Sequence, residues 1–323
     1  DRFEIDCTTT ALFIVAGWSI GKYQLNTIIK TDQVNSIIAM MISICIPTIL
    51  YTVFVQLWRF KGQEFHWESI LLYSNFIDFN IDKDDGYNFW FIMVLVQSLA
   101  MIFIMFSLKP IRQLVKKNAY RFAVAATIFF FIVAVAGGIV WDTGAPIHHR
   151  VPHLKLWLLF FGMAIALADT KARRMLMNAM AIGIFWILWN VSEDISWFPR
   201  EAFFSPWETK NVYPWFPLIA TLFIINMRRV SVPKLLTPAI NLIAGASLFI
   251  YLMNMQFYGL FKHTPIAKSL PLATLFAVLG SIFIWKVWEQ LAAKCHMFFY
   301  DFMQKNYPMR TIGNNKKEDR LIH

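Results

Sequence analysis

Charged residues and cysteines are scarce in this sequence. Asp, Glu, Lys and Arg make up 15% of the 323 residues, whereas a soluble domain carries about 25%. The three cysteines, Cys7, Cys45 and Cys295, lie far apart in the chain. This number and spacing exclude a readable disulfide framework and a cysteine-based metal site. The alternation of apolar and polar residues that marks a transmembrane barrel is also absent.

Apolar residues are abundant instead. Hydrophobic residues make up 58% of the chain and aromatic residues 17%, and the mean hydropathy is +0.50. Apolar runs of about 20 residues, long enough to cross a bilayer as helices, recur along the sequence. They predict an all-α polytopic membrane helical bundle with about nine transmembrane helices, at residues 9–29, 36–58, 88–108, 121–141, 155–171, 175–191, 212–228, 235–257 and 270–289.

The net charge of +10 comes from basic residues that cluster at the ends of these apolar runs. This placement indicates membrane topology rather than nucleic-acid binding. With nine spans, four basic clusters fall on one side of the membrane, and the positive-inside rule makes that side, with the C-terminus, cytoplasmic. The clusters are Lys109 to Arg121, Lys171 to Arg174, Arg228 to Lys234, and Lys294 to Arg320.

Nine spans and a cytoplasmic C-terminus put Asp1 on the outside. A chain that begins without a signal peptide does not readily place its N-terminus there. We therefore expect a tenth helix before Asp1, supplied by an N-terminal segment or by a partner. We also expect a transmembrane domain over residues 1–290 and a cytoplasmic, amphipathic and basic tail over residues 291–323.

A dense group of ionisable residues lies between two of the apolar runs, within Trp141 to Gly162. Polar groups beside hydrocarbon are costly, so this group is either a functional site or a solvated loop between helices. Histidine is the usual general base near neutral pH, and Arg150 suits an anion or anchors the interface. The irregular spacing does not favour a metal site. The catalytic candidates are Asp142, His148, His149 and His153.

Polar residues elsewhere in the spans have ordinary structural interpretations. Gln97 and Ser98 lie inside the third predicted span, where such residues usually hydrogen-bond between helices. Asp169 lies beside Lys171 and Arg173 at the inner end of the fifth span, which predicts a surface ion pair.

Several segments, in order along the chain, resemble the acyltransferase 3 family of integral-membrane acyltransferases. Leu12 to Trp18 is similar to the second helix of that family, with Ala16 in place of its serine. The span containing Pro47 is similar to its third helix. Tyr87 to Ile92 is similar to the aromatic start of a further helix. Trp157 to Met163 is similar to the family's Phe-x-x-Gly-Met helix, with Leu159 at the position of its first Phe. Ser247 to Leu252 is similar to its late Ser-x-x-x-Tyr-Leu motif.

This resemblance implies transfer of an acyl group, acetyl being the expectation, from a cytoplasmic thioester such as acyl-coenzyme A. The acceptor is the hydroxyl of a glycan, lipid or small molecule, no cofactor is tightly bound, and the location is the bacterial inner membrane. It also implies candidate substrate-binding residues at Arg150, Trp90, Gln97, Ser247, Tyr251 and Asn254. The expected donor-binding residues are Arg112, Lys116 and Lys117, although membrane topology explains these residues better than a ligand does.

The family's first helix, which carries its catalytic histidine, has no counterpart in this sequence, and it corresponds to the tenth helix that topology calls for. The family's late histidine is also missing, with Asn254 near its place. Two alternatives therefore stay open. One is a transporter of a small anion or lipid, with Arg150 and the histidines at its site. The other is a non-catalytic membrane subunit.

Overall fold

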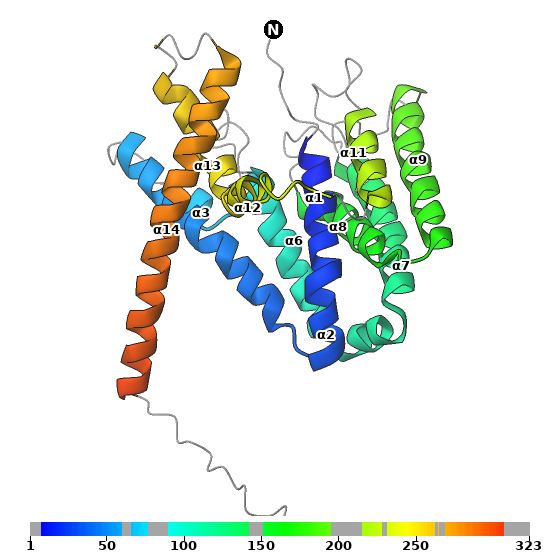
Figure 1. Cartoon of the computed structure of the whole chain (residues 1–323). Coiled ribbons are helices and arrows are strands. Elements are labelled where there is room, and N and C mark those ends of the chain that lie inside the picture. The colour runs from blue at the N-terminus through cyan, green and yellow to red at the C-terminus, as the bar shows by residue number, and fades with distance from the viewer. Residues whose placement is uncertain are drawn as a thin grey trace, which may run out of the picture. The chain divides into compact units, whose positions relative to one another are not determined.

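A computed structural model describes residues 8–59, 66–76, 90–141, 151–194, 215–227, 231–261, 264 and 269–306. Every regular element among them is helical. The chain divides into two compact units, residues 1–231 and 232–323. Figure 1 gives the order of the helices along the chain.

Four helices are long and apolar enough to cross a membrane, which supports an integral membrane protein. They contain the segments Asn35–Leu57, Trp90–Ser107, Lys109–Ala136 and Pro271–Lys294. Helices also occur at the other predicted positions, but they are shorter, less apolar or interrupted. The number of nine spans therefore stays a prediction.

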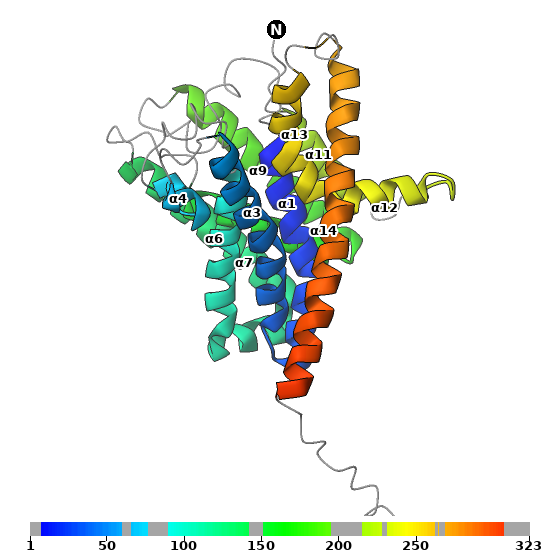
Figure 2. The ribbon, with the colours of Figure 1, turned by 90° about the vertical axis from the view of Figure 1, so that its left-hand side faces the viewer.

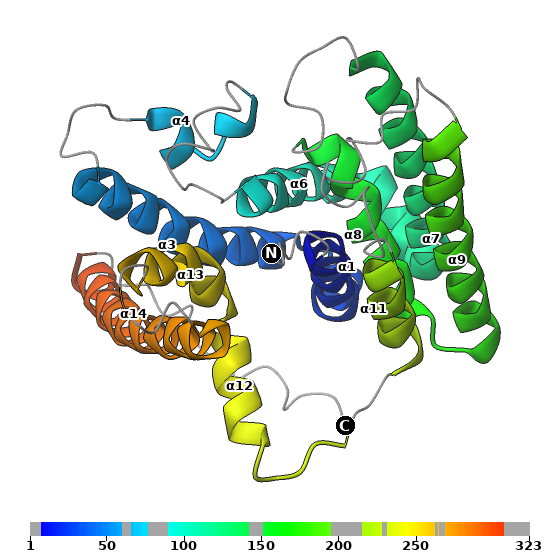
Figure 3. The same cartoon turned by 90° about the horizontal axis from the view of Figure 1, so that it is seen from above.

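The first unit is built around α8 (Pro152–Leu167). Figure 3 shows α8 between α1 (Thr8–Ser19), α6 (Trp90–Ser107) and α7 (Lys109–Trp141). All but one of the side chains from Val151 to Ile165 are buried, as expected for a helix that is apolar on every face. Aromatic rings join α8 to α7, and Phe160 stacks on Phe130 with ring centroids 5.2 Å apart.

The crossing of α1 and α8 depends on glycine. A Cβ atom added at Gly17 would lie 2.0 Å from the carbonyl oxygen of Leu159, and one added at Gly162 would lie 2.0 Å from that of Ile14. Gly21, one turn beyond Gly17, faces Met163 at 2.8 Å in the same way. This Gly-x-x-x-Gly pattern lets two membrane helices approach backbone to backbone.

The helix that starts with α1 continues beyond this crossing. A π-helical turn, η1 (Ile20–Gln24), joins α1 to α2 (Leu25–Thr31) without a break. At the end of α2, Asp32 adopts a left-handed conformation with φ of 60° and its N–H donates to the Ile28 carbonyl oxygen. This left-handed cap ends the helix, and α3 (Asn35–Arg59) follows.

The rest of the first unit comprises short elements and an outer pair of helices. The α4 (Trp67–Ile70) and η2 (Ser74–Phe76) turns lie between α3 and α6 in sequence. The α9 (Lys171–Asp194) and α11 (Trp215–Asn226) helices follow α8. Asn178 and Asn226 join these two by reciprocal side-chain hydrogen bonds of 3.0 and 3.2 Å.

The second unit corrects one predicted span. Residues 235–257 are not one helix, because the chain breaks at Ala246 between α12 (Thr237–Gly245) and α13 (Ser247–Phe261). Figure 2 shows α13 alongside α14 (Leu270–Asn306), with α12 crossing the direction of α14. The backbone at Gly245 lies so close to α14 that an added Cβ would lie 2.7 Å from the Trp285 ring. The helix break thus lies next to a close contact between Gly245 and α14, and the uninterrupted apolar sequence gives no sign of it.

Candidate functional site

The polar cluster before α8 falls mostly outside the described residues. Asp142, His148, His149 and Arg150 lie there, so their predicted roles stay predictions. His153 is described: it lies in the first turn of α8 and its side chain is half-buried. The turn begins at Val151 in extended conformation with Pro152 as the first helical residue, a position that proline favours.

Lys155, two residues after His153, is the charged residue that the sequence analysis missed. It is only 6% exposed, although its neighbours Leu154 and Leu156 are apolar. A lysine within an apolar run is a functional-site hypothesis by default, and this signal was present in the sequence. Nearby, the indole nitrogen of Trp157 is buried without a hydrogen-bond partner among the described residues. This end of α8 therefore combines a histidine, a buried cation and an unsatisfied donor.

Gln97, a predicted substrate-binding residue, forms structural hydrogen bonds to a neighbouring segment of the chain. Its amide exchanges hydrogen bonds of 2.7 and 3.0 Å with the amide of Asn75, and its nitrogen also donates to the Leu72 carbonyl oxygen at 2.7 Å. Gln97 thus attaches the segment 66–76 to α6. In the same way, the Gln56 amide of α3 donates to the His66 carbonyl oxygen at 2.9 Å and accepts from the His66 N–H at 3.2 Å.

Two other residues of α6 are buried. Trp90, the first residue of the helix and a predicted substrate-binding residue, is 8% exposed. Ser98 is fully buried, and its hydroxyl has no hydrogen-bond partner among the described residues. Within the described ranges, Ser98 therefore forms no hydrogen bond to a second helix of the kind that the sequence predicted.

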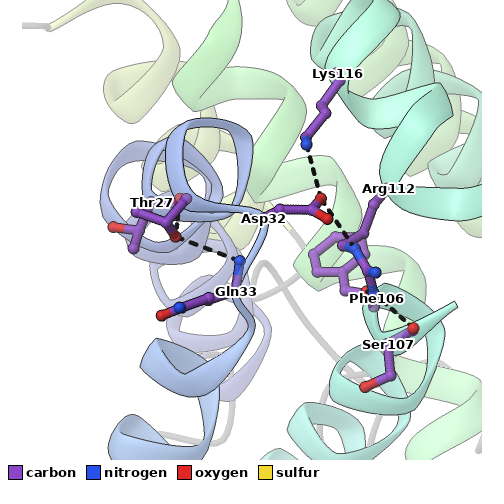
Figure 4. A network of polar contacts seen from close by, with 8 residues as sticks. Thr27, Asp32, Gln33, Phe106, Ser107, Arg112 and Lys116 are labelled. Atoms are coloured by element: carbon purple, nitrogen blue, oxygen red, sulfur yellow. Dashed lines mark hydrogen bonds and ion pairs between the residues drawn. The ribbon is translucent and has the colours of Figure 1, made fainter. Parts of the chain in front are cut away.

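The other end of α6 carries an ion-pair network centred on Asp32 (Figure 4). The Asp32 carboxylate accepts from Lys116 Nζ at 2.7 Å and from Arg112 Nε at 3.1 Å. Arg112 also donates through Nη1 to the carbonyl oxygens of Phe106 and Ser107, at 2.9 and 2.6 Å. These carbonyls end α6 and have no intrahelical partner.

This network changes the interpretation of the predicted donor-binding residues. The hydrogen bond from Lys116, with the charge of Arg112, holds the pKa of Asp32 below its usual value. Arg112 and Lys116 therefore share one carboxylate of the same chain, which offsets one of their two positive charges. Lys117 has no ion-pair partner among the described residues, and its side chain is exposed.

The predicted ion pair of Asp169 is confirmed with Arg173. Arg173 Nη1 contacts Asp169 Oδ1 at 2.7 Å, and the Arg173 guanidinium lies 4.6 Å from the centre of the Tyr120 ring. This contact joins the turn after α8 to the start of the apolar part of α7. This contact brings together residues of two of the four predicted basic clusters, Lys109 to Arg121 and Lys171 to Arg174.

The remaining predicted substrate-binding residues belong to the second unit. Ser247 is the first residue of α13 and is exposed, and Tyr251 follows one turn later and is half-buried. The side chain of Asn254 lies outside the described residues. Within the described part of the chain, no three His, Cys, Asp or Glu side chains are grouped to hold a metal ion.

Comparison with known proteins gives no further assignment. No protein-family model, no curated protein and no solved structure matches the chain.

Proposed function

We propose that the protein is a membrane-bound acyltransferase of the acyltransferase 3 type, which moves an acyl group from a cytoplasmic thioester to an acceptor hydroxyl. The support is the ordered set of sequence segments that resemble this family. One observation carries the proposal: two of these segments contact each other through their glycines, Gly17 in Leu12 to Trp18 and Gly162 in Trp157 to Met163. Two segments that the resemblance singles out separately thus lie at one helix crossing.

The start of α8 supplies groups that suit this chemistry. In the proposed step, His153 takes the proton of the acceptor hydroxyl, and the hydroxyl oxygen attacks the thioester carbonyl. The carbon–sulfur bond breaks, the ester bond forms, and the proton passes to the leaving thiolate. A positive charge at Lys155 favours the developing oxyanion. His148 and His149 remain the other candidates for the base.

The test is acyl transfer by the full chain in isolated membranes. Membranes containing the protein are incubated with acetyl-coenzyme A labelled on the acetyl group, and label in the lipid and glycan fractions is compared with release of free thiol. We expect the His153→Gln variant to transfer label about 10²- to 10⁴-fold more slowly, the usual contribution of a general base.

His66→Gln is the matched control. His66 is also half-buried, and Gln56 bonds to its backbone. Its ring Nδ1 lies 3.1 Å from Glu68 Oε1, a contact that a glutamine amide can also make. This variant should therefore keep its transfer rate. Absence of transfer and thiol release with the unaltered protein would contradict the proposal, and an unchanged rate in His153→Gln would remove His153 as the base.

A transporter of a small anion or lipid is the second candidate function. The observation that favours it is the break at Ala246 within the predicted span 235–257. Interrupted helices free backbone polar groups and are typical of transporter binding sites. Uptake of a labelled anion into sealed vesicles, without thiol release from the acyl donor, would support this candidate over the first.

A further inference from the structure

The first part of α7 is separate from its apolar part. Asn118 has φ of −162° and ψ of 90°, which is not helical, so α7 consists of a short segment before Asn118 and a long one after it. Figure 4 includes Arg112 and Lys116 of the short segment beside the Asp32 turn. We call residues 108–117 the surface segment, and its Arg112 contacts both Asp32 at the end of α2 and the last carbonyl oxygens of α6.

The cations on and beside the surface segment form two groups. Arg112 and Lys116 are paired with Asp32, and Arg173 is paired with Asp169. Three others have exposed side chains and no ion-pair partner among the described residues, and they are Lys109, Lys117 and Arg121. The carboxylates of Asp32 and Asp169 already form ion pairs with other cations, so this surface carries a net positive charge.

Exposed apolar side chains lie on the same segment. Leu108 is 54% exposed and Leu114 is 55% exposed, whereas Val115, about 100° around the helix from Leu114, is 1% exposed. Lys117 and Ile111 lie three residues after and before Leu114, so their side chains flank Leu114 on the helix surface. Apolar side chains beside lysines are typical of a helix that lies in the membrane interface.

We propose that the surface segment is an interfacial helix that binds the phosphate head groups of anionic phospholipids. Lys109, Lys117 and Arg121 contact the phosphates, and Leu108 and Leu114 insert among the upper acyl chains. A soluble phosphate ligand has no use for two exposed leucines, so the occupant is a lipid. The proposal rests on the membrane location of the chain and is independent of the acyltransferase proposal.

The experiment measures the lipid preference of the full chain. The purified protein is equilibrated in mixed micelles with equal amounts of phosphatidylglycerol and phosphatidylcholine, and bound lipids are counted by native mass spectrometry. We expect the unaltered protein to retain phosphatidylglycerol preferentially. Each of the three cations contributes about a fivefold preference, equivalent to about 1 kcal/mol for a basic residue near an anionic surface.

Three variants test the residues that carry the preference. K109Q/K117Q/R121Q should lose most of it, whereas K109R/K117R, which keeps the charges, should retain it. Leu114→Ser should lower total lipid retention, and Gln113→Ser, at the exposed neighbouring position, should leave it unchanged. Normal unfolding temperatures in detergent identify variants that remain folded.

Two results would overturn the proposal. The first is an unchanged phosphatidylglycerol preference in the folded K109Q/K117Q/R121Q variant. The second is displacement of the bound phosphatidylglycerol by millimolar inorganic phosphate, because it would assign the cations to a soluble phosphate ligand. Loss of the preference in K109R/K117R as well as in the glutamine variant would show that packing, rather than charge, selects the lipid.

Discussion

Replacing Gly17 with alanine would place a methyl group 2.0 Å from the Leu159 carbonyl oxygen and 2.7 Å from its Cα. Both of these atoms belong to the backbone of α8, so no side-chain rotation can relieve the clash. Ordinary contact begins near 3.4 Å, so the helices have to separate by about 1.4 Å along this line. We therefore expect Gly17→Ala to weaken the crossing around which the first unit is built.

The size of the effect follows from two opposing contributions. Forcing a methyl group into a close-packed interior costs about 1–3 kcal/mol, and a clash with backbone places this variant near the upper value. Alanine returns up to about 1 kcal/mol through its higher helix propensity. The expected net loss is about 2 kcal/mol in the free energy of unfolding, which is about a 30-fold change in the folding equilibrium.

The assay is reversible unfolding in mixed detergent micelles, with Gly183→Ala as the matched control. Gly183 lies within α9, and an added Cβ there meets nothing within 4 Å, so this variant should be neutral or slightly stabilised. Gly162→Ala faces the same crossing from the other helix. Once one substitution has separated the helices, the second should cost less, so the double variant should lose less than the sum of the single losses. Equal stabilities for Gly17→Ala and Gly183→Ala would refute the reasoning.

Three further predictions concern polar contacts. Gln97→Leu should destabilise the segment 66–76 by about 1–3 kcal/mol because it removes the hydrogen bonds of Gln97 to Asn75 and to the Leu72 carbonyl oxygen, and limited proteolysis within that segment should accelerate. Ser98→Ala, which removes a buried hydroxyl that has no hydrogen-bond partner among the described residues, should not destabilise the protein. Because the pKa of Asp32 is lowered in the folded protein, its ion pairs stabilise the fold above the unfolded pKa of about 3.9, and this stabilisation is lost as the pH falls through the lower folded pKa. Stability measured from pH 6 to pH 2 should therefore fall less steeply in Asp32→Asn, a variant whose asparagine is tolerated at φ of 60°. Identical pH profiles for the two proteins would contradict the pairing. Arg112→Lys keeps the charge but loses the planar fork that reaches Asp32 and two carbonyls at once, so it should lower the unfolding temperature, whereas Lys117→Gln should not.

The candidate site could be predicted from sequence only where local composition is informative. His153 was found because histidines cluster before an apolar run, and the Asp169–Arg173 pair was found because basic residues follow Asp169 closely at the end of a predicted span. Lys155 was detectable by the same logic and was missed. The pairing of Asp32 with Arg112 and Lys116 was beyond sequence reasoning, because 80 residues separate Asp32 from Arg112.

The sequence by itself determined that the chain is helical and suited to a membrane, because the transfer of apolar residues out of water depends on each segment's own composition. It also located most of the long helices, but not α4, the helical segment before Asn118 or the break at Ala246. Tertiary structure alone decided which glycines form the crossing of α1 and α8, which glutamines bind the segment 66–76, and which cations are neutralised. These choices depend on contacts between backbones and side chains far apart in the chain, and no local pattern of hydropathy or charge specifies such contacts.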